Sequence, residues 1–270
     1  MRYIFNPIAA LVLFMLLTTS CQKVIDVSLK DSEPAYIIEG EVTDAPGPYF
    51  VSVTRSKNFD ENNNFPAVEG AVVVIKNTTS NTIDTLTEVS AGRYKTNTTQ
   101  GVGGNTYELH VVADGKTFVS KTTMPTQAVA IDSMYLRVSD FGGDIRFIVP
   151  EYTDPVGFGN RYLLRQYVNG KLLPGTIARS DDVTDGEKSQ FPLYYFSEEN
   201  DGEPFINAGD TLKVELLCVD NAVYEFYRTL DETIDQNSGT PANPLSTFTG
   251  GAIGVFKAAR INTKVIIADF

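Results

Sequence analysis

The feature that most constrains the fold of this 270-residue chain is a period-two alternation of apolar and polar residues, broken at short intervals by turn residues. The stretch NTYELHVVADGKTFVSKTT, Asn105–Thr123, is an example, with two alternating runs on either side of Asp114-Gly115. Successive side chains of a strand point to opposite faces, so such runs predict strands with one buried face. An Asp-Gly pair between them favours a two-residue hairpin turn of type I′.

Residues 35–125 contain about seven runs of this kind and predict an N-terminal β-sandwich. The order VEGAVVVIKN, AGRYKTN, GNTYELHVVADGK within this block resembles the transthyretin-like sandwich of carboxypeptidase-regulatory-like modules. The resemblance covers Tyr36–Pro125. It implies a fold only, because a shared sandwich does not carry a function with it.

A second block is predicted for residues 126–270, because Pro125 interrupts a strand and a new alternating run begins at Ile131. Its strands, with a hairpin turn at Asn169-Gly170, indicate a second sandwich closer to a fibronectin type III arrangement. The predicted fold class is therefore mainly β.

One helix is predicted in the second block, at about residues 221–235, with Asp220 or Asn221 as its N-cap. Apolar side chains recur there at helical spacing and form one face that is expected to pack on a sheet: Val223, Phe226, Tyr227, Leu230 and Ile234. A glycine-rich C-terminal loop follows, in which three glycines allow close backbone approach: Gly250, Gly251 and Gly254.

The N-terminus has the layout of a secretory signal. Arg2 provides a positive charge, and the apolar core Ile8–Leu17 is too short for a bilayer, which needs about 20 apolar residues. The small residues before Cys21 resemble a bacterial lipobox. We therefore predict a lipoprotein signal peptide at 1–20, lipidation of Cys21, for example with palmitate, and a tether at 21–34. An ordinary signal peptide followed by a chance cysteine is the alternative.

The formal net charge of −12 argues against two classes of partner. Nucleic acid requires basic surface, and electrostatic adsorption to anionic lipid requires the same. Acidity of this kind keeps a protein soluble outside the cytoplasm. We expect no nucleic-acid partner.

Residues for catalysis are scarce. His110 is the only histidine and lies in a predicted strand, so neither a histidine metal cluster nor a Ser-His-Asp triad is available. Cys218 lies in the apolar run LKVELLCVD, which favours a buried thiol, and a disulfide with Cys21 is the alternative. We expect neither an enzyme nor a cofactor.

Three acidic loops offer oxygen ligands of the type that calcium prefers: Asp60–Asn64, Asp181–Glu187 and Asn200–Glu203. None has the ligand spacing of an EF-hand. Solvated turns are the preferred interpretation, so no metal site is predicted.

Aromatic side chains are the remaining candidates for contact with a partner or a ligand. They come from the runs EYTDPVGFGNRY and FPLYYFSEEN and from the C-terminal loop: Phe158, Tyr194, Tyr195, Phe248 and Phe256. Because alternate strand residues face opposite sides, at most half of the run LYYF lies on one exposed face. The chain has no tryptophan, which weakens the case for glycan stacking.

Several motifs together resemble the DUF4249 family of Bacteroidota lipoproteins: CQKVIDVSL after the signal, YIIEGEVTD with GPYFVSVTRS, GDTLKVELLCVDNAVYEFYRTL, and NPLSTFTGGAIGVFKA near the C-terminus. The resemblance runs from Cys21 to the C-terminus. It departs at Ser246–Phe248, where relatives often carry an asparagine. It implies a lipid-anchored outer-membrane protein, on the cell surface or facing the periplasm, that accompanies a SusC-type TonB-dependent β-barrel transporter.

Two functions are therefore expected. The first is a non-catalytic accessory or ligand-capturing partner of such a transporter. The alternative is a free-standing surface protein, for example an adhesin component, that binds a glycan or peptide through aromatic loops.

Overall fold

The computed structural model describes residues 34–57, 65–139, 145–194, 206–234 and 243–270. The predicted signal peptide, Cys21 and the predicted tether up to residue 33 lie outside these ranges, as does Tyr195. Within the described residues, none of the helices combines the length and the apolar character needed to cross a membrane.

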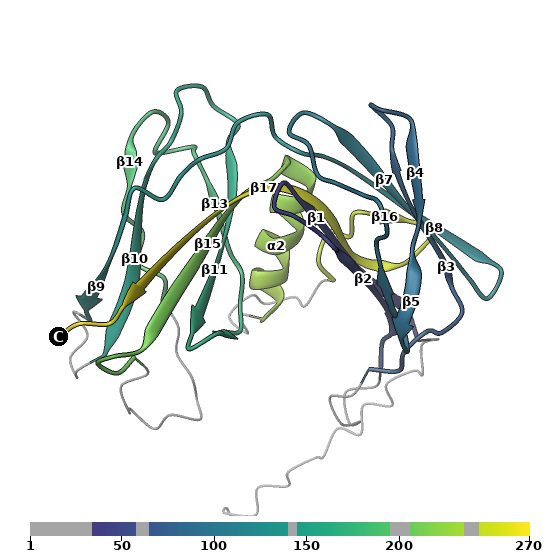
Figure 1. Ribbon diagram of the computed structural model, residues 1–270, viewed down its shortest axis with the longest axis horizontal. Coiled ribbons are helices and arrows are strands. Elements are labelled where there is room, and N and C mark those ends of the chain that lie inside the picture. Colours follow the sequence, from purple (N-terminus) through teal and green to yellow (C-terminus); the bar gives the residue numbers. More distant parts are fainter. Residues whose placement is uncertain (1–33, 58–64, 140–144, 195–205, 235–242) are drawn as a thin grey trace, which may run out of the picture. The chain divides into compact units, whose positions relative to one another are not determined.

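The first half of the chain forms short strands from the alternating runs (Figure 1). These strands are β1 (Tyr36–Thr43), β2 (Phe50–Arg55), β3 (Val72–Asn77), β4 (Thr82–Thr85), β5 (Thr87–Ser90), β6 (Arg93–Lys95), β7 (Thr106–Ala113) and β8 (Lys116–Thr123). They divide between two sheets, one containing β1-β2-β6-β5 and the other containing β8-β7-β3-β4. Inward-facing side chains of both sheets share one apolar core, so the predicted mainly β, sandwich-type fold is confirmed.

The second half is also mainly β. Its elements are β9 (Ser133–Val138), β10 (Arg146–Thr153), β11 (Arg161–Val168), β12 (Lys171–Leu172), β13 (Ile177–Ser180), β14 (Lys188–Ser189), β15 (Thr211–Cys218), α2 (Asn221–Ile234), β16 (Phe248–Thr249) and β17 (Ile253–Ile267). Strands β14-β10-β9 form one sheet. Strands β12-β11-β15-β17, with β13 paired to β11, continue the sheet of β1-β2-β6-β5, and together they make one large nine-stranded sheet. A second apolar core lies between these sheets.

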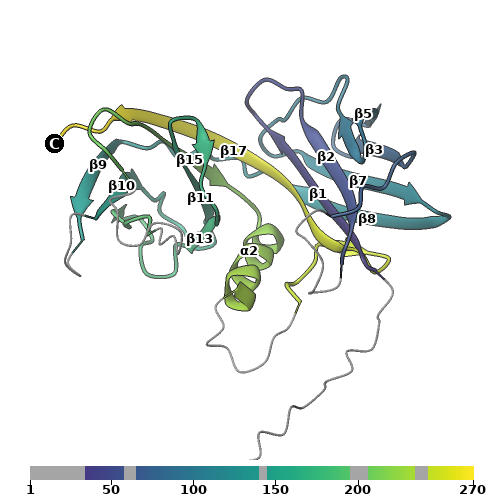
Figure 2. The same ribbon diagram turned by 90° about the horizontal axis from the view of Figure 1, so that it is seen from below.

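Strand β17 joins the two halves (Figure 2). Its first part, Ile253–Ala259, runs parallel to β1, whereas Arg260–Ile267 runs antiparallel to β15. Strand β16 pairs with β8. The glycine-rich C-terminal segment therefore contributes strands to the sheets of the first half, although the sequence grouped all residues after 125 in a second block.

The predicted turns and helix cap are confirmed. Asp114 and Gly115 have φ angles of 48° and 74°, and Asn169 and Gly170 have 49° and 78°, as the two central residues of type I′ turns require. Helix α2 begins at Asn221, and the amide of Val223 donates to Oδ1 of Asp220 at 3.0 Å.

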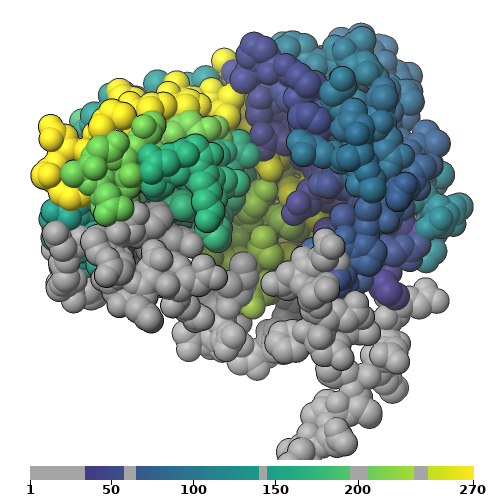
Figure 3. All heavy atoms as spheres, turned by 60° about the horizontal axis from the view of Figure 1, so that its bottom comes forward, coloured from purple at the N-terminus to yellow at the C-terminus, as the bar shows by residue number. Residues whose placement is uncertain are grey.

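Helix α2 covers the face of the large sheet that points away from the two sandwich cores. Val223 and Phe226 are buried there against Leu217 and Val255, as the predicted apolar stripe requires. In this sheet β15 lies between β11 and β17, and the space-filling view shows atoms of α2 beside these strands (Figure 3).

Candidate binding loops and charged seam

The single histidine, His110, and the cysteine Cys218 both lie in strands of the two halves. His110 lies in β7, and its ring contacts the carboxylate of Glu108 at 3.3 Å. Cys218 is a free, buried cysteine in β15, and burial raises the pKa of its thiol to about 11. A thiol of this kind is protonated at neutral pH and is a weak nucleophile. Neither residue belongs to the group of potential metal ligands found among the described residues.

The structure buries two of the predicted contact residues. Phe248 is 8% exposed and Phe256 is fully buried, and both belong to the core of the first half. The sequence placed them in a loop, but β16 and β17 pair with β8 and β1 and turn these rings inward. This burial argues against their role in partner contact.

Two other predicted contact residues, Tyr194 and Phe158, are exposed. Tyr194 is 41% exposed, and its ring meets that of Phe147 edge-on, with 4.6 Å between centroids. Phe158 is 75% exposed. Tyr195 lies outside the described residues.

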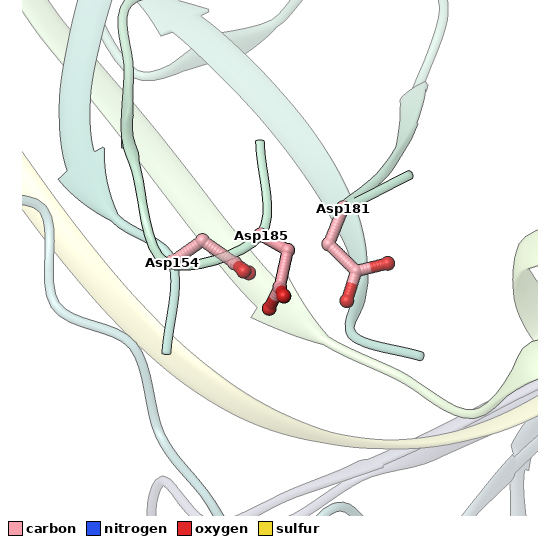
Figure 4. Close-up of side chains that lie close together, drawn as sticks. All are labelled: Asp154, Asp181 and Asp185. Atoms are coloured by element: carbon pink, nitrogen blue, oxygen red, sulfur yellow. The ribbon is translucent and has the colours of Figure 1, made fainter. Parts of the chain in front are cut away.

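Phe158 belongs to a pair of loops that lie together at one end of the second half. Residues 154–160 connect β10 to β11, and residues 181–187 connect β13 to β14. We call them the acidic loop pair. Three side chains in it, Asp154, Asp181 and Asp185, each present a carboxylate oxygen within 4.8 Å of the others (Figure 4). This set is the carboxylate cluster.

The carboxylate cluster is hydrogen-bonded mainly to backbone amides of the same loops. Asp181 is fully buried, and its Oδ2 accepts from the amides of Gly159 at 2.7 Å and Asn160 at 2.8 Å. Asp185 Oδ1 accepts from the amide of Gly157 at 2.5 Å. Each carboxylate therefore fixes the backbone of the opposite loop.

Asp154 and Asp181 also have side-chain partners. Asp154 accepts from the hydroxyl of Tyr162, and its other oxygen accepts from the amide of Gly186 at 3.3 Å. Arg161 donates to Oδ1 of Asp181 at 2.8 Å. Protein donors thus occupy both oxygens of Asp154 and of Asp181, so the cluster acts as a clamp between loops.

The sequence favoured a solvated turn for residues 181–187, and the structure corrects this for Asp181. Asp182 beside it is 64% exposed at its side chain, whereas Asp181 is fully buried. Asp154, which lies 27 positions before Asp181, was not predicted as its neighbour. The other two acidic loops considered for calcium, Asp60–Asn64 and Asn200–Glu203, lie outside the described residues.

A second charged group was not predicted at all. Glu41 of β1 accepts from Arg165 of β11 at 2.8 Å and contacts Lys257 of β17 at 3.0 Å. Arg165 also contacts Glu215 of β15 at 2.9 Å. We call Glu41, Arg165, Glu215 and Lys257 the charged seam, because they join strands of both halves on the face that carries α2.

The charged seam is largely shielded from water. Its side chains are between 11% and 27% exposed. Burial raises the pKa of Glu41, but the charges of Lys257 and Arg165 outweigh it, so the pKa is lower than its ordinary value. Lys257 Nζ also lies 2.9 Å from the hydroxyl of Tyr227 on α2, which links the helix to the seam.

Two neighbouring hollows in the first half are small or shallow. One of about 160 Å³ in the first half lies beside Asp84, below the 300–1,000 Å³ that is typical of ligand pockets. Asp84 accepts from the amides of Asn97, Thr98 and Thr99, which fixes that loop. A hollow of about 450 Å³ beside it is open and lined mainly by residues 95–100.

Comparison with known proteins identifies a family. A family model described as a domain of unknown function, DUF4249, matches residues 22–264. A search of curated proteins found no match. Because the match covers most of the chain, this protein belongs to the DUF4249 family.

Proposed function

We propose that this chain is a non-catalytic binding protein of the outer membrane that serves as an accessory or ligand-capturing partner of a TonB-dependent β-barrel transporter. The observation that carries the binding role is the acidic loop pair. There, exposed apolar side chains stand on a backbone that buried carboxylates hold in place.

The ionisable groups support binding rather than catalysis. The buried carboxylates Asp154 and Asp181 are engaged with protein donors, and the thiol of Cys218 has a raised pKa. A general base or nucleophile needs a pKa near the working pH and room for a substrate. A rigid β scaffold with exposed loops is a common platform for binding.

Attachment to the membrane is part of the proposal. Acylation of Cys21 would hold the mature chain at the outer membrane, facing the cell surface. Residues 22–33 would then link the lipid anchor to the folded part of the chain. Labelling of native cells with palmitate tests this part. The full-length chain is expected to incorporate the label, the variant Cys21→Ala to lose it, and the control Cys218→Ala to retain it.

Purification of the tagged full-length chain from its native outer membrane in mild detergent tests the transporter role. The expected result is a β-barrel transporter in stoichiometric amount, identified by mass spectrometry. Recovery of the chain alone would contradict this role. It would favour the alternative, a free-standing surface protein that binds a glycan or peptide, and the chain without its lipid would then bind that ligand by itself.

A further inference from the structure

Three apolar side chains of the acidic loop pair are unusually exposed. Val156 is 87% exposed, Val183 is 85% exposed and Phe158 is 75% exposed. The next most exposed large apolar side chain among the described residues, Ile83, is 65% exposed. We call Val156, Phe158 and Val183 the apolar tip.

The backbone conformation keeps the apolar tip pointing outward. Gly157 and Gly159 have φ angles of 123° and 114° on either side of Phe158, values that side-chain-bearing residues rarely adopt. A Cβ at either glycine would meet no atom within 4 Å. The glycines are therefore required by the turn that presents Phe158, and not by a lack of space.

The two loops of the tip are held to each other. The amide of Gly157 donates to Asp185 and that of Gly159 to Asp181, across from one loop to the other. The side chain of Val156 lies against Gly186, where an added Cβ would be 3.0 Å from Cγ2. Val156, Phe158 and Val183 therefore lie on adjoining turns of one clamped unit, and little conformational entropy is lost when such a surface binds.

The charged residues within the two loops of the apolar tip are all acidic. Residues 154–160 and 181–187 contain Asp154, Asp181, Asp182, Asp185 and Glu187 but no lysine or arginine. Arg161, which follows directly, is only 15% exposed at its side chain and is paired with Asp181. The exposed charges of the two loops are Asp182 and Glu187, and the neighbouring Lys188 is 53% exposed at its side chain and pairs with Glu151.

We propose that the apolar tip docks into an apolar recess of a partner protein whose rim carries lysine or arginine. Apolar anchors in a recess with complementary charge at the rim are the usual anatomy of a protein interface. An anionic lipid surface would repel Asp182 and Glu187. This inference adds the docking surface to the proposed function. It rests on that function only because it requires a protein partner.

Photo-crosslinking in native cells tests the inference. The full-length chain carries p-benzoylphenylalanine at position 158, and a control chain carries it at position 83, where Ile83 is also exposed but lies on β4 of the first half. The expected result is a discrete protein adduct from position 158 that is absent from position 83. The adduct is then identified by mass spectrometry.

Charge reversal at the rim gives the second readout. In the variant Asp182→Lys/Glu187→Lys the yield of this adduct is expected to fall by about fivefold or more, because like charges then face each other. Because Asp182 is exposed but lies 3.4 Å from Arg161, the circular dichroism spectrum and melting temperature of the variant are compared with those of the parent to establish that the variant is folded. An undiminished adduct in the folded variant would overturn the proposal.

Two other outcomes would overturn it: crosslinking to lipid alone, or no discrete protein adduct at position 158. If a barrel co-purifies with the chain but position 158 gives no discrete protein adduct, the proposed function is retained and only the docking role of the apolar tip is rejected. An adduct with a protein other than a barrel, if sensitive to charge reversal, would support the tip and contradict the transporter role.

Discussion

The charged seam and the carboxylate cluster both hold carboxylates away from water, but they satisfy them differently. In the seam, Glu41 and Glu215 are paired with cations from strands far apart in the sequence. In the cluster, Asp181 and Asp185 accept mainly from backbone amides of two neighbouring loops. The seam therefore connects the two halves, whereas the cluster shapes one surface.

This difference predicts how much of the protein each substitution destabilises. A change in the seam is expected to lower the free energy of unfolding of the whole protein. A change in the cluster is expected to loosen the acidic loop pair, and a change in the apolar tip is expected to leave stability nearly unaltered. The predictions below run in that order and are measured on the mature chain without its lipid.

The largest effect is expected for Gly254→Ala, where β17 runs beside β1. Gly254 has a φ of 139°, and an added Cβ would overlap the carbonyl oxygen of Ile38. Strain and backbone displacement together are expected to cost about 4 kcal/mol or more, measured by urea unfolding. Gly251→Ala is the control, because Gly251 also has a positive φ but its Cβ would meet no atom within 4 Å. Equal losses in the two variants would show that the β1–β17 pairing is not critical.

Lys257→Met is expected to have the next largest effect, about 3 kcal/mol, because it removes a cation beside the largely buried Glu41. The exposed Lys171→Met is the control and is expected to change stability by at most about 0.5 kcal/mol. The double variant Lys257→Met/Glu41→Met is expected to regain part of the loss, since no carboxylate is then left short of a partner. Additive losses would contradict the coupling of the seam.

Asp181→Ala is expected to cost about 2 kcal/mol, because the amides of Gly159 and Asn160 lose their acceptor. Hydrogen exchange should show the locality of the effect. Exchange is expected to speed up at these two amides while that of Leu109 in β7 stays as in the parent. The exposed neighbour Asp182→Ala serves as the control, and faster exchange throughout the chain in Asp181→Ala would remove the distinction between cluster and seam.

Acid is expected to weaken the seam gradually. The folded-state pKa of Glu41 is below its ordinary value, so its contribution to stability is present above about pH 4.5 and is lost as the pH falls through the folded-state pKa. Urea unfolding of the parent and of Glu41→Gln, followed from pH 7 to pH 3, should show a smaller decline in the variant. Parallel declines would mean that other carboxylates dominate the acid response.

Phe158→Ser is expected to have the smallest effect on stability, within about 0.5 kcal/mol, because the ring is 75% exposed. Its thermal unfolding should coincide with that of the parent. A marked loss of stability would show that the ring packs within the protein, which would contradict its assignment to the apolar tip.

Local features of the fold were predictable from the sequence. Asp114-Gly115 and Asn169-Gly170 form the expected hairpin turns, and Asp220 caps the expected helix. These features depend on residues that are close in the chain, so their physical cause is present in the sequence itself. The period-two pattern likewise indicated which side chains of β1 are buried, since Ile38 and Val42 lie in the core and Glu39 does not.

Long-range pairing was not predictable in the same way. The sequence contains no signal that Ile253–Ala259 would pair with β1, more than 200 residues earlier. For that reason Phe248 and Phe256 were expected in an exposed loop but are buried. Of the predicted contact residues that the structure describes, Phe158 is the most exposed, because a turn flanked by two glycines with positive φ determines its exposure locally.

By itself, the sequence determined the strand and turn content of this protein, the position of its described helix and its membership of the DUF4249 family. Only the tertiary structure decided which charges meet. Glu41 and Lys257 are separated by 216 positions yet lie 3.0 Å apart, and Asp154 meets Asp181 across two loops. The reason is physical: turns, caps and alternation depend on neighbours in the chain, whereas ion pairs and buried carboxylates depend on how distant strands align.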